Sequence, residues 1–301
     1  MRFSALIPVV FITASFILAF LCLFAGSKQG FLEDYAVITW NTSRIGYDVL
    51  DNSDSSSSSS GLTSIIDNIG DEIGDSIEGA INDVAQDLGI HDFYSAHLMN
   101  YCEGFYTPAA IPNATVSKSD IHKNVTACSN RTAMYNFDPQ QIIQKELNNS
   151  VGSGVVNLVN DLNWPEDITN GIRALQVAAK AAFVLYCIAI GFIGVALILA
   201  VVSIFFEGRL SALLNMLVDW LAFLVLGIAS AIATAIAVKG ASVINKYGDD
   251  IGVSAQQGNK FMILTWVATG LLLLASIVWC FDCIAGRRRR VAEPKYNHSR
   301  Y

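Results

Sequence analysis

Four long apolar segments constrain the fold of this 301-residue chain more than any other feature of its sequence. They cover residues 5–26, 181–206, 210–238 and 261–285. Each is long enough for a helix to cross about 30 Å of hydrocarbon, which takes roughly 20 residues. Charged residues make up 15% of the chain, against about 25% in a typical soluble domain. The sequence therefore predicts a membrane protein and argues against a disordered chain or an ordinary soluble enzyme.

Positive charges and glycosylation sequons indicate the same orientation. Arg2, Arg209 and the run of Arg287, Arg288, Arg289 and Arg290 flank the apolar segments on one side, which we assign to the cytosol. A sequon at Asn297 lies on this side and should be silent. Five Asn-x-Ser/Thr sequons lie on the other side, where glycosylation takes place: Asn41, Asn113, Asn124, Asn130 and Asn148.

The expected topology follows from these boundaries. A cytosolic N-terminus (1–4) precedes the first span (5–26), an extracellular domain (27–180) and the second span (181–206). A cytosolic turn (207–209), the third span (210–238), an extracellular loop (239–260), the fourth span (261–285) and a basic cytosolic tail (286–301) follow. The first segment is long for a cleaved signal peptide, although the small residues at 25–27 leave cleavage open. The predicted fold class is all-α, a four-transmembrane-helix bundle with an ectodomain between spans 1 and 2.

The expected ectodomain is acidic and divides by composition. Residues 27–176 contain 20 acidic and 7 basic residues, a balance of −13 that would repel nucleic acid. Residues 51–60 form a serine-rich linker. In residues 62–88, apolar side chains recur at steps of three and four, which predicts an acidic amphipathic helix. This helix would dock on its own ectodomain or bind a partner or second copy.

Two cysteines, Cys102 and Cys128, are the only ones outside the apolar segments and their immediate flanks. In an oxidising compartment we expect them to form a disulfide that staples a small ectodomain with a thin core. They lie in the region 91–132, which also holds three histidines, His91, His97 and His122. The histidines lack metal-ligand spacing and would either titrate near neutral or mildly acid pH or be ordinary surface and packing residues.

Asp219 is the acidic residue deep within an apolar segment. It would lie at the membrane interface or in a protonated packing contact, or else take part in proton or ion movement. The same segment carries Gly227, Ala231 and Ala235 at four-residue spacing. Such small residues let helices approach closely, either within the bundle or between copies of the chain.

Cys280 and Cys283 lie at the cytosolic end of the fourth segment, where they would be S-acylated or inert. The adjacent Arg287–Arg290 run would fix topology and attract anionic lipid. The sequence contains no phosphate-binding glycine loop, zinc-protease motif or nucleophile elbow. We therefore expect no enzyme activity, cofactor, bound metal or small-molecule substrate.

The stretch HDFYSAHLMNYC at 91–102, the EGFYTP that follows, Cys128-Ser129, WPEDI at 164–168 and AFVLYCIAIGF at 182–192 resemble the fungal Sur/PalI-type family. These are claudin-like tetraspan proteins of the plasma membrane, and the resemblance covers about residues 88–283. It implies the Cys102–Cys128 disulfide and carries over no catalytic residue.

The resemblance implies a non-enzymatic organiser of cortical patches or eisosomes, which affects endocytosis, cell-wall deposition and stress response. Membrane lipids, further copies of the chain or other cortical proteins would be its partners. The alternatives are an accessory of alkaline-pH signalling, the PalI branch, and a transporter or channel subunit that uses Asp219. The short tail after residue 286 favours the organiser over the PalI branch.

Overall fold

The computed structural model describes residues 6–43, 90–108, 117–136, 138, 141–142, 145, 166–205, 209–248 and 253–292. The chain divides into two compact units. One, the helix unit, comprises Met1–Leu23, Ala182–Ala231 and Met262–Tyr301. The other, the sheet unit, comprises Phe24–Ala181 and Ile232–Phe261. The expected linker and acidic helix, residues 51–60 and 62–88, lie outside the described residues.

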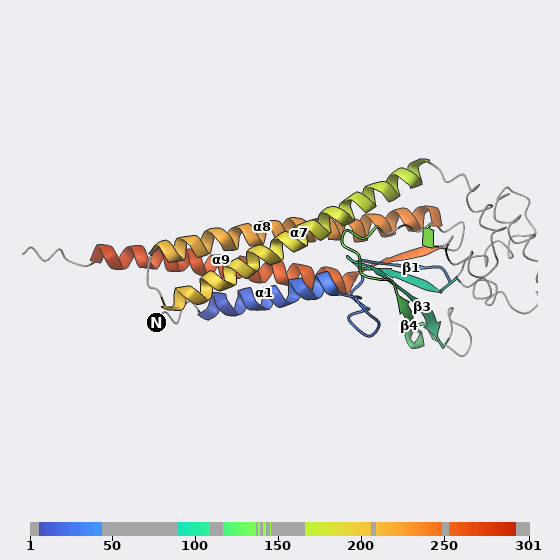
Figure 1. Ribbon diagram of the computed structural model, residues 1–301, viewed down its shortest axis with the longest axis horizontal. Helices are drawn as coiled ribbons and strands as arrows, with labels where there is room; N and C mark the ends of the chain where they lie inside the picture. Colours follow the sequence, from blue (N-terminus) through green and yellow to red (C-terminus); the bar gives the residue numbers. More distant parts are fainter. Residues whose placement is uncertain are drawn as a thin grey trace, which may run out of the picture. The chain divides into compact units, whose positions relative to one another are not determined.

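Four long helices carry the apolar segments (Figure 1). They are α1 (Leu6–Phe24), α7 (Glu166–Phe205), α8 (Arg209–Gly248) and α9 (Asn259–Ala292). All four are long and apolar enough to cross a membrane, as the sequence predicted. Three of them extend beyond the apolar segments, because α7 begins at Glu166, α8 continues to Gly248 and α9 continues through the arginine run.

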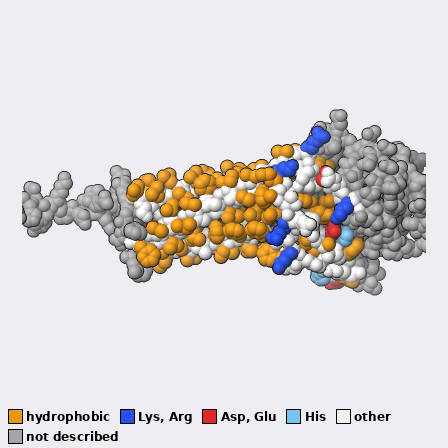
Figure 2. All heavy atoms as spheres, in the orientation of Figure 1, with side chains coloured by type: hydrophobic (Ala, Val, Ile, Leu, Met, Phe, Trp, Pro, Cys, Tyr) orange, Lys and Arg blue, Asp and Glu red, His pale blue; other side chains and the backbone are white. Residues whose placement is uncertain are grey.

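The helix unit buries many small side chains and exposes many large apolar ones. Ala189, Ala222 and Ala275 are fully buried, whereas Ile198 is 65% exposed and Ile228 is 53% exposed. Orange apolar side chains accordingly dominate the visible surface of the helices in Figure 2. Helices in water show the opposite pattern, whereas helices in lipid pack through small residues and expose large apolar ones. The chain is therefore a multi-pass membrane protein.

Contacts inside the helix unit connect α9 to its neighbours. Ser15 of α1 donates a hydrogen bond to the carbonyl of Ala268, with 2.9 Å between Oγ and the oxygen. The hydroxyls of Tyr186 on α7 and Thr265 on α9 are 2.5 Å apart. Buried hydroxyls in a membrane need such partners because no water is present to replace them.

A five-stranded antiparallel sheet corrects the all-α prediction. Its strands are β1 (Ile38–Asn41), β2 (Phe93–Ala96), β3 (Tyr101–Thr107), β4 (His122–Cys128) and β5 (Ser254–Gln257), in the order β4-β3-β2-β1-β5. A short 3-10 helix, Lys118–Asp120, precedes β4. The prediction failed because three strands have only four residues and two neighbours, β1 and β5, lie more than 200 residues apart in the sequence.

Both faces of the sheet carry a small buried cluster. One face packs Ile38, Ala96 and Ala255 against Ala241 of α8. The other packs Phe93, Cys102 and Val125, with Tyr106 and Cys128 beside them. Alternate residues of a strand point to opposite faces, so these short strands supply two thin cores.

In the segment expected to be an extracellular loop, residues 239–260, most of the described residues have regular structure. It holds the last turns of α8 and the edge strand β5. The side chain of Asn245 binds Ala255 at both backbone groups, with Nδ2 donating over 3.0 Å and Oδ1 accepting over 2.6 Å. This pair of bonds fixes β5 against the end of α8.

Candidate functional site

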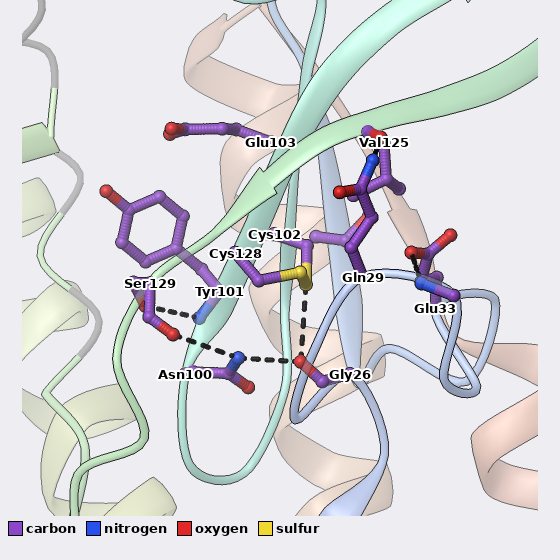
Figure 3. Close-up of a disulfide and its surroundings, with 12 residues drawn as sticks. Gly26, Gln29, Glu33, Asn100, Tyr101, Cys102, Glu103, Val125, Cys128 and Ser129 are labelled. Atoms are coloured by element: carbon purple, nitrogen blue, oxygen red, sulfur yellow. Dashed lines mark hydrogen bonds between the residues drawn. A yellow bond between two sulfur atoms is a disulfide. The ribbon is translucent and has the colours of Figure 1, made fainter.

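The predicted disulfide joins β3 to β4 in the sheet unit (Figure 3). Cys102 and Cys128 are partners in the strand register, and their sulfur atoms are 2.03 Å apart. Cys102 is fully buried in the cluster with Phe93 and Val125. Cys128 is half-buried, and the bond closes a loop with a sequence separation of 26.

The carbonyl of Gly26, just after α1, lies against this disulfide (Figure 3). Asn100 donates a hydrogen bond to it from Nδ2 over 2.6 Å, and Cys102 Sγ lies 3.3 Å from the same oxygen. The sulfur contact is not a hydrogen bond, because a disulfide sulfur carries no proton. Asn100 Nδ2 also donates to the carbonyl of Ser129 at 3.3 Å. Asn100 thereby ties the chain that follows α1 to the end of β4.

His97 packs directly on Gly26, in the turn between β2 and β3. Gly26 has φ of +66°, and a Cβ at this position would come within 2.3 Å of the His97 ring. Only glycine adopts this conformation without cost and leaves room for the imidazole. Burial lowers the pKa of His97 from 6.5 to about 4. The expectation that this histidine titrates near neutral pH is therefore wrong, and the packing interpretation is correct for it.

His97 predicts an acid-dependent loss of stability in the sheet unit. Between pH 6.5 and 4 the unfolded chain binds a proton that the folded chain excludes, so stability falls as the pH drops through this window. From pH 7.5 to pH 5, the expected loss is about 2 kcal/mol. Thermal unfolding of the full chain at the two pH values, followed by tryptophan fluorescence, measures it.

Two leucine variants isolate this effect. His97→Leu should remove about 2 kcal/mol of the pH dependence. His122→Leu, at an exposed position on β4, is the control for loss of an imidazole from the same sheet. An equal pH dependence in the wild type and in His97→Leu would contradict the assignment.

Polar contacts also cross the sheet at Lys123. Its Nζ donates to Thr39 Oγ1 over 3.0 Å and lies 5.4 Å from the ring centroid of Phe93. Thr39 Oγ1 and Ser95 Oγ are 3.3 Å apart. Burial lowers the pKa of Lys123. These contacts link side chains of β4, β2 and β1.

Three of the five predicted acceptor sequons fall on described residues. Asn124 on β4 and Asn130 just after it are exposed. Asn41 ends β1 and is half-buried, and its Oδ1 accepts hydrogen bonds from the backbone N and the Oγ of Ser43, at 3.0 and 2.6 Å. Asn113 and Asn148 lie outside the described residues. Asn124 and Asn130 are therefore the sterically accessible acceptors among the described asparagines.

Asp219 lies fully buried in the helix packing. Ser276 of α9 donates to its Oδ2 from Oγ over 3.1 Å. Its Oδ1 has no hydrogen-bond partner, and no basic side chain contacts the carboxyl group, among the described residues. Burying an isolated carboxylate is very costly, so this environment suits the neutral acid as a packing contact between α8 and α9.

A cluster of hydroxyls between α7, α8 and α9 escaped the sequence analysis. Ser230 Oγ lies 2.6 Å from Thr265 Oγ1 and 3.1 Å from Thr269 Oγ1, and Thr265 also reaches Tyr186. All four side chains are buried. The four-residue spacing of Thr265 and Thr269 could have indicated this cluster, because it places both hydroxyls on one helix face.

The three small residues of α8, Gly227, Ala231 and Ala235, do not share one environment. A Cβ on Gly227 would lie 3.7 Å from Thr269 of α9, so Gly227 packs within the bundle. Ala231 and Ala235 are instead exposed. Bundle packing alone therefore does not account for the series.

The predicted residues near the end of α9 are placed as follows. Cys280 is half-buried, with Sγ 3.7 Å from Met216 Sδ, and Cys283 is also half-buried. Arg287–Arg290 continue the helix, and their side chains lie outside the description.

A stapled sheet and four apolar helices are thus encoded in one chain, and its sequence matches the SUR7/PalI family over residues 4–278. The chain belongs to the SUR7/PalI family. This confirms the resemblance found in the sequence. The family match covers every strand of the sheet and the first three apolar segments in full, and it ends within the fourth.

One curated relative is the SUR7 family protein pun1 of Schizosaccharomyces pombe. It is 26% identical over 112 residues, which are 37% of this chain and 33% of the relative. The matched region of this chain thus covers about a third of the length of the relative. No solved structure matches the chain.

Proposed function

We propose that this SUR7/PalI-family protein is a non-enzymatic organiser of cortical patches or eisosome-type domains in a fungal plasma membrane. The observation that carries the proposal is the family match over residues 4–278. In this role the protein clusters laterally and affects endocytosis, cell-wall deposition and stress response. Its partners are membrane lipids, further copies of itself and other cortical proteins.

Exposed small residues on α8 support lateral association. Ala231 and Ala235 are exposed small residues on α8, where a second helix can approach closely. S-acyl chains on Cys280 and Cys283, together with Arg287–Arg290 at the anionic inner leaflet, would strengthen the attachment. Such contacts add up when many copies occupy one patch.

The sheet unit supports an orientation with both termini in the cytosol. Asn124 and Asn130 are exposed on or beside β4, so glycans fit there without disturbing the core. The Cys102–Cys128 disulfide suits the same oxidising compartment. In the proposed topology the glycosylated sheet unit faces the cell wall.

The distribution of the chain in living fungal cells tests this proposal. We expect a C-terminal fluorescent tag to mark discrete patches at the cortex. A uniform rim would contradict the organiser role, and an internal reticular signal would contradict the plasma-membrane location. A tag that is quenched by an impermeant reagent added outside intact cells would contradict the orientation.

The family description also includes PalI, which keeps an accessory role in alkaline-pH signalling as the second candidate. Deletion of the gene separates the two. Loss of alkaline adaptation with intact cortical domains would favour the signalling role. Dispersed domains with normal alkaline adaptation would favour the organiser.

A further inference from the structure

A lysine stands at one end of each of the four apolar segments. Lys28 follows residues 5–26, Lys180 precedes 181–206, Lys239 follows 210–238 and Lys260 precedes 261–285. The first is two residues from its segment, and the other three are adjacent to theirs. All four belong to the sheet unit, and we call them the lysine collar.

The collar is exposed and only partly neutralised. All four side chains are exposed. Lys260 Nζ lies 2.5 Å from Asp34 Oδ2. In the described part of the chain, no acidic side chain forms an ion pair with Lys28, Lys180 or Lys239. Figure 2 shows Lys and Arg side chains (blue) gathered in a band.

The position of the collar along each helix sets its depth in a membrane. A lysine next to an apolar segment extends its flexible stem along the hydrocarbon and places its ammonium group at the level of the headgroups. Arg173 and Lys246 are also exposed, but each lies seven residues further along its helix, away from the apolar segment. At 1.5 Å per residue they lie about 10 Å beyond the collar. This distance is about one Debye length at physiological ionic strength, so salt weakens their interaction with headgroups.

Topology does not explain the collar. α8 has Arg209 at its start and Lys239 beyond its apolar segment, and α9 has Lys260 at its start and Arg287–Arg290 near its end. Positive charge therefore flanks the apolar segments of α8 and α9 at both ends, whereas the positive-inside rule accounts for one end only. The collar thus places positive charge at headgroup depth beyond what topology requires, and the anion present at that depth in a membrane is the lipid phosphate.

We propose that the lysine collar binds the phosphate groups of membrane lipids and favours anionic headgroups over zwitterionic ones. The proposal does not depend on patch formation. In the orientation proposed above, the collar acts on the outer leaflet, at the end of the helices opposite to the arginine run. It would give the protein an annulus of selected lipid at that end of the apolar segments.

Native mass spectrometry of the full chain in mild detergent tests the proposal. The protein is titrated with phosphatidylglycerol or phosphatidylcholine of the same acyl chains. We expect phosphatidylglycerol to bind the wild type more tightly. In the triple variant Lys28→Gln, Lys180→Gln, Lys239→Gln its affinity should fall by about fivefold for each lysine replaced, with phosphatidylcholine binding little changed. This variant keeps Lys260, and therefore its ion pair with Asp34.

The matched control is Arg173→Gln, Lys246→Gln, which removes two exposed cations of the same helices above the headgroup level. Its preference for phosphatidylglycerol should stay within about twofold of the wild type, because screening weakens charges at that distance. Both variants retain Arg287–Arg290, so lipid bound at the arginine run contributes equally to the two measured affinities. An unchanged preference in the triple variant, or an equal loss of both lipids, would overturn the proposal.

The alternative to lipid that the experiment must separate is the acidic segment 62–88 of the same chain. If it neutralises the lysines, deletion of residues 62–88 raises phosphatidylglycerol affinity while the triple substitution in the intact chain changes nothing. That pair of results would overturn lipid binding. A loss in the triple variant that persists in the deletion background would support it.

Discussion

Replacing Cys102 with serine is expected to lower the free energy of unfolding of the sheet unit by about 3.5 kcal/mol. The disulfide closes a loop with a sequence separation of 26 and so restricts the unfolded chain. Its loss raises the conformational entropy of the unfolded state. The new hydroxyl would also sit in a fully buried apolar position beside Phe93 and Val125. A fall in the melting temperature on the order of 10 °C, measured on the purified full chain, is the expected result.

A double-mutant cycle separates the disulfide from its two side chains. Cys128→Ser and the double variant should be destabilised about as much as Cys102→Ser alone, because one bond is lost in each. Reductant should destabilise the wild type and leave the variants unchanged. Additive losses, or a wild type indifferent to reductant under unfolding conditions, would show that the bond does not stabilise the sheet. If the sheet unit serves the proposed patches, Cys102→Ser should also disperse them.

Replacing Gly258 with alanine is expected to destabilise the sheet unit by about 3 kcal/mol. Gly258 lies between β5 and α9, and its N–H donates to the carbonyl of Val37 over 2.9 Å. A Cβ there would lie 1.8 Å from the Ala36 carbonyl oxygen and 2.7 Å from that of Val37. Both obstacles are backbone atoms, so β5 must separate from β1 to accept the methyl group. Thermal unfolding of the full chain measures the loss.

Gly171→Ala is the matched control in the same unit. Gly171 lies in α7, and a Cβ there meets nothing within 4 Å. Alanine favours a helix by up to about 1 kcal/mol over glycine, so this variant should be neutral or more stable. Equal stabilities for the two variants would contradict the close approach of β1 to Gly258. Hydrogen exchange at Gly258 should also become faster if the β1–β5 pairing weakens.

The helices were predictable from the sequence because their signal is local. Residues 181–206 and 261–285 are continuous apolar stretches, and hydrocarbon requires that length of helix from any chain that crosses it. Where each helix stops was less clear. Residues 239–248 are polar enough to suggest a loop, yet they continue α8, because Ala241 packs on the sheet and Asn245 binds β5.

The sheet was not predictable because its strands are short and depend on distant partners. β5 has the sequence Ser-Ala-Gln-Gln, which has no apolar alternation, and it forms because β1 pairs with it from 216 residues earlier. The disulfide was predicted because only two cysteines lie away from the apolar segments. Its setting against Gly26 and Asn100 was not, because that contact joins the turn after α1 to residues 74 positions later.

Asp219 shows a different limit. Its position in an apolar segment was plain from the sequence, but its partner was not, since Ser276 lies 57 residues away on α9. Likewise, the sequence identified the series Gly227, Ala231 and Ala235 without showing that its last two members face away from the bundle. Helix periodicity shows which residues share a face, and only packing shows what that face meets.

Fluorescence recovery after photobleaching of the tagged chain tests the central claim most directly, because an organiser of static domains must itself be held in place. A bleached cortical patch is expected to stay dark over minutes, while a single-pass membrane marker in the same cell recovers in seconds. Rapid and complete recovery of the tagged chain would contradict lateral clustering.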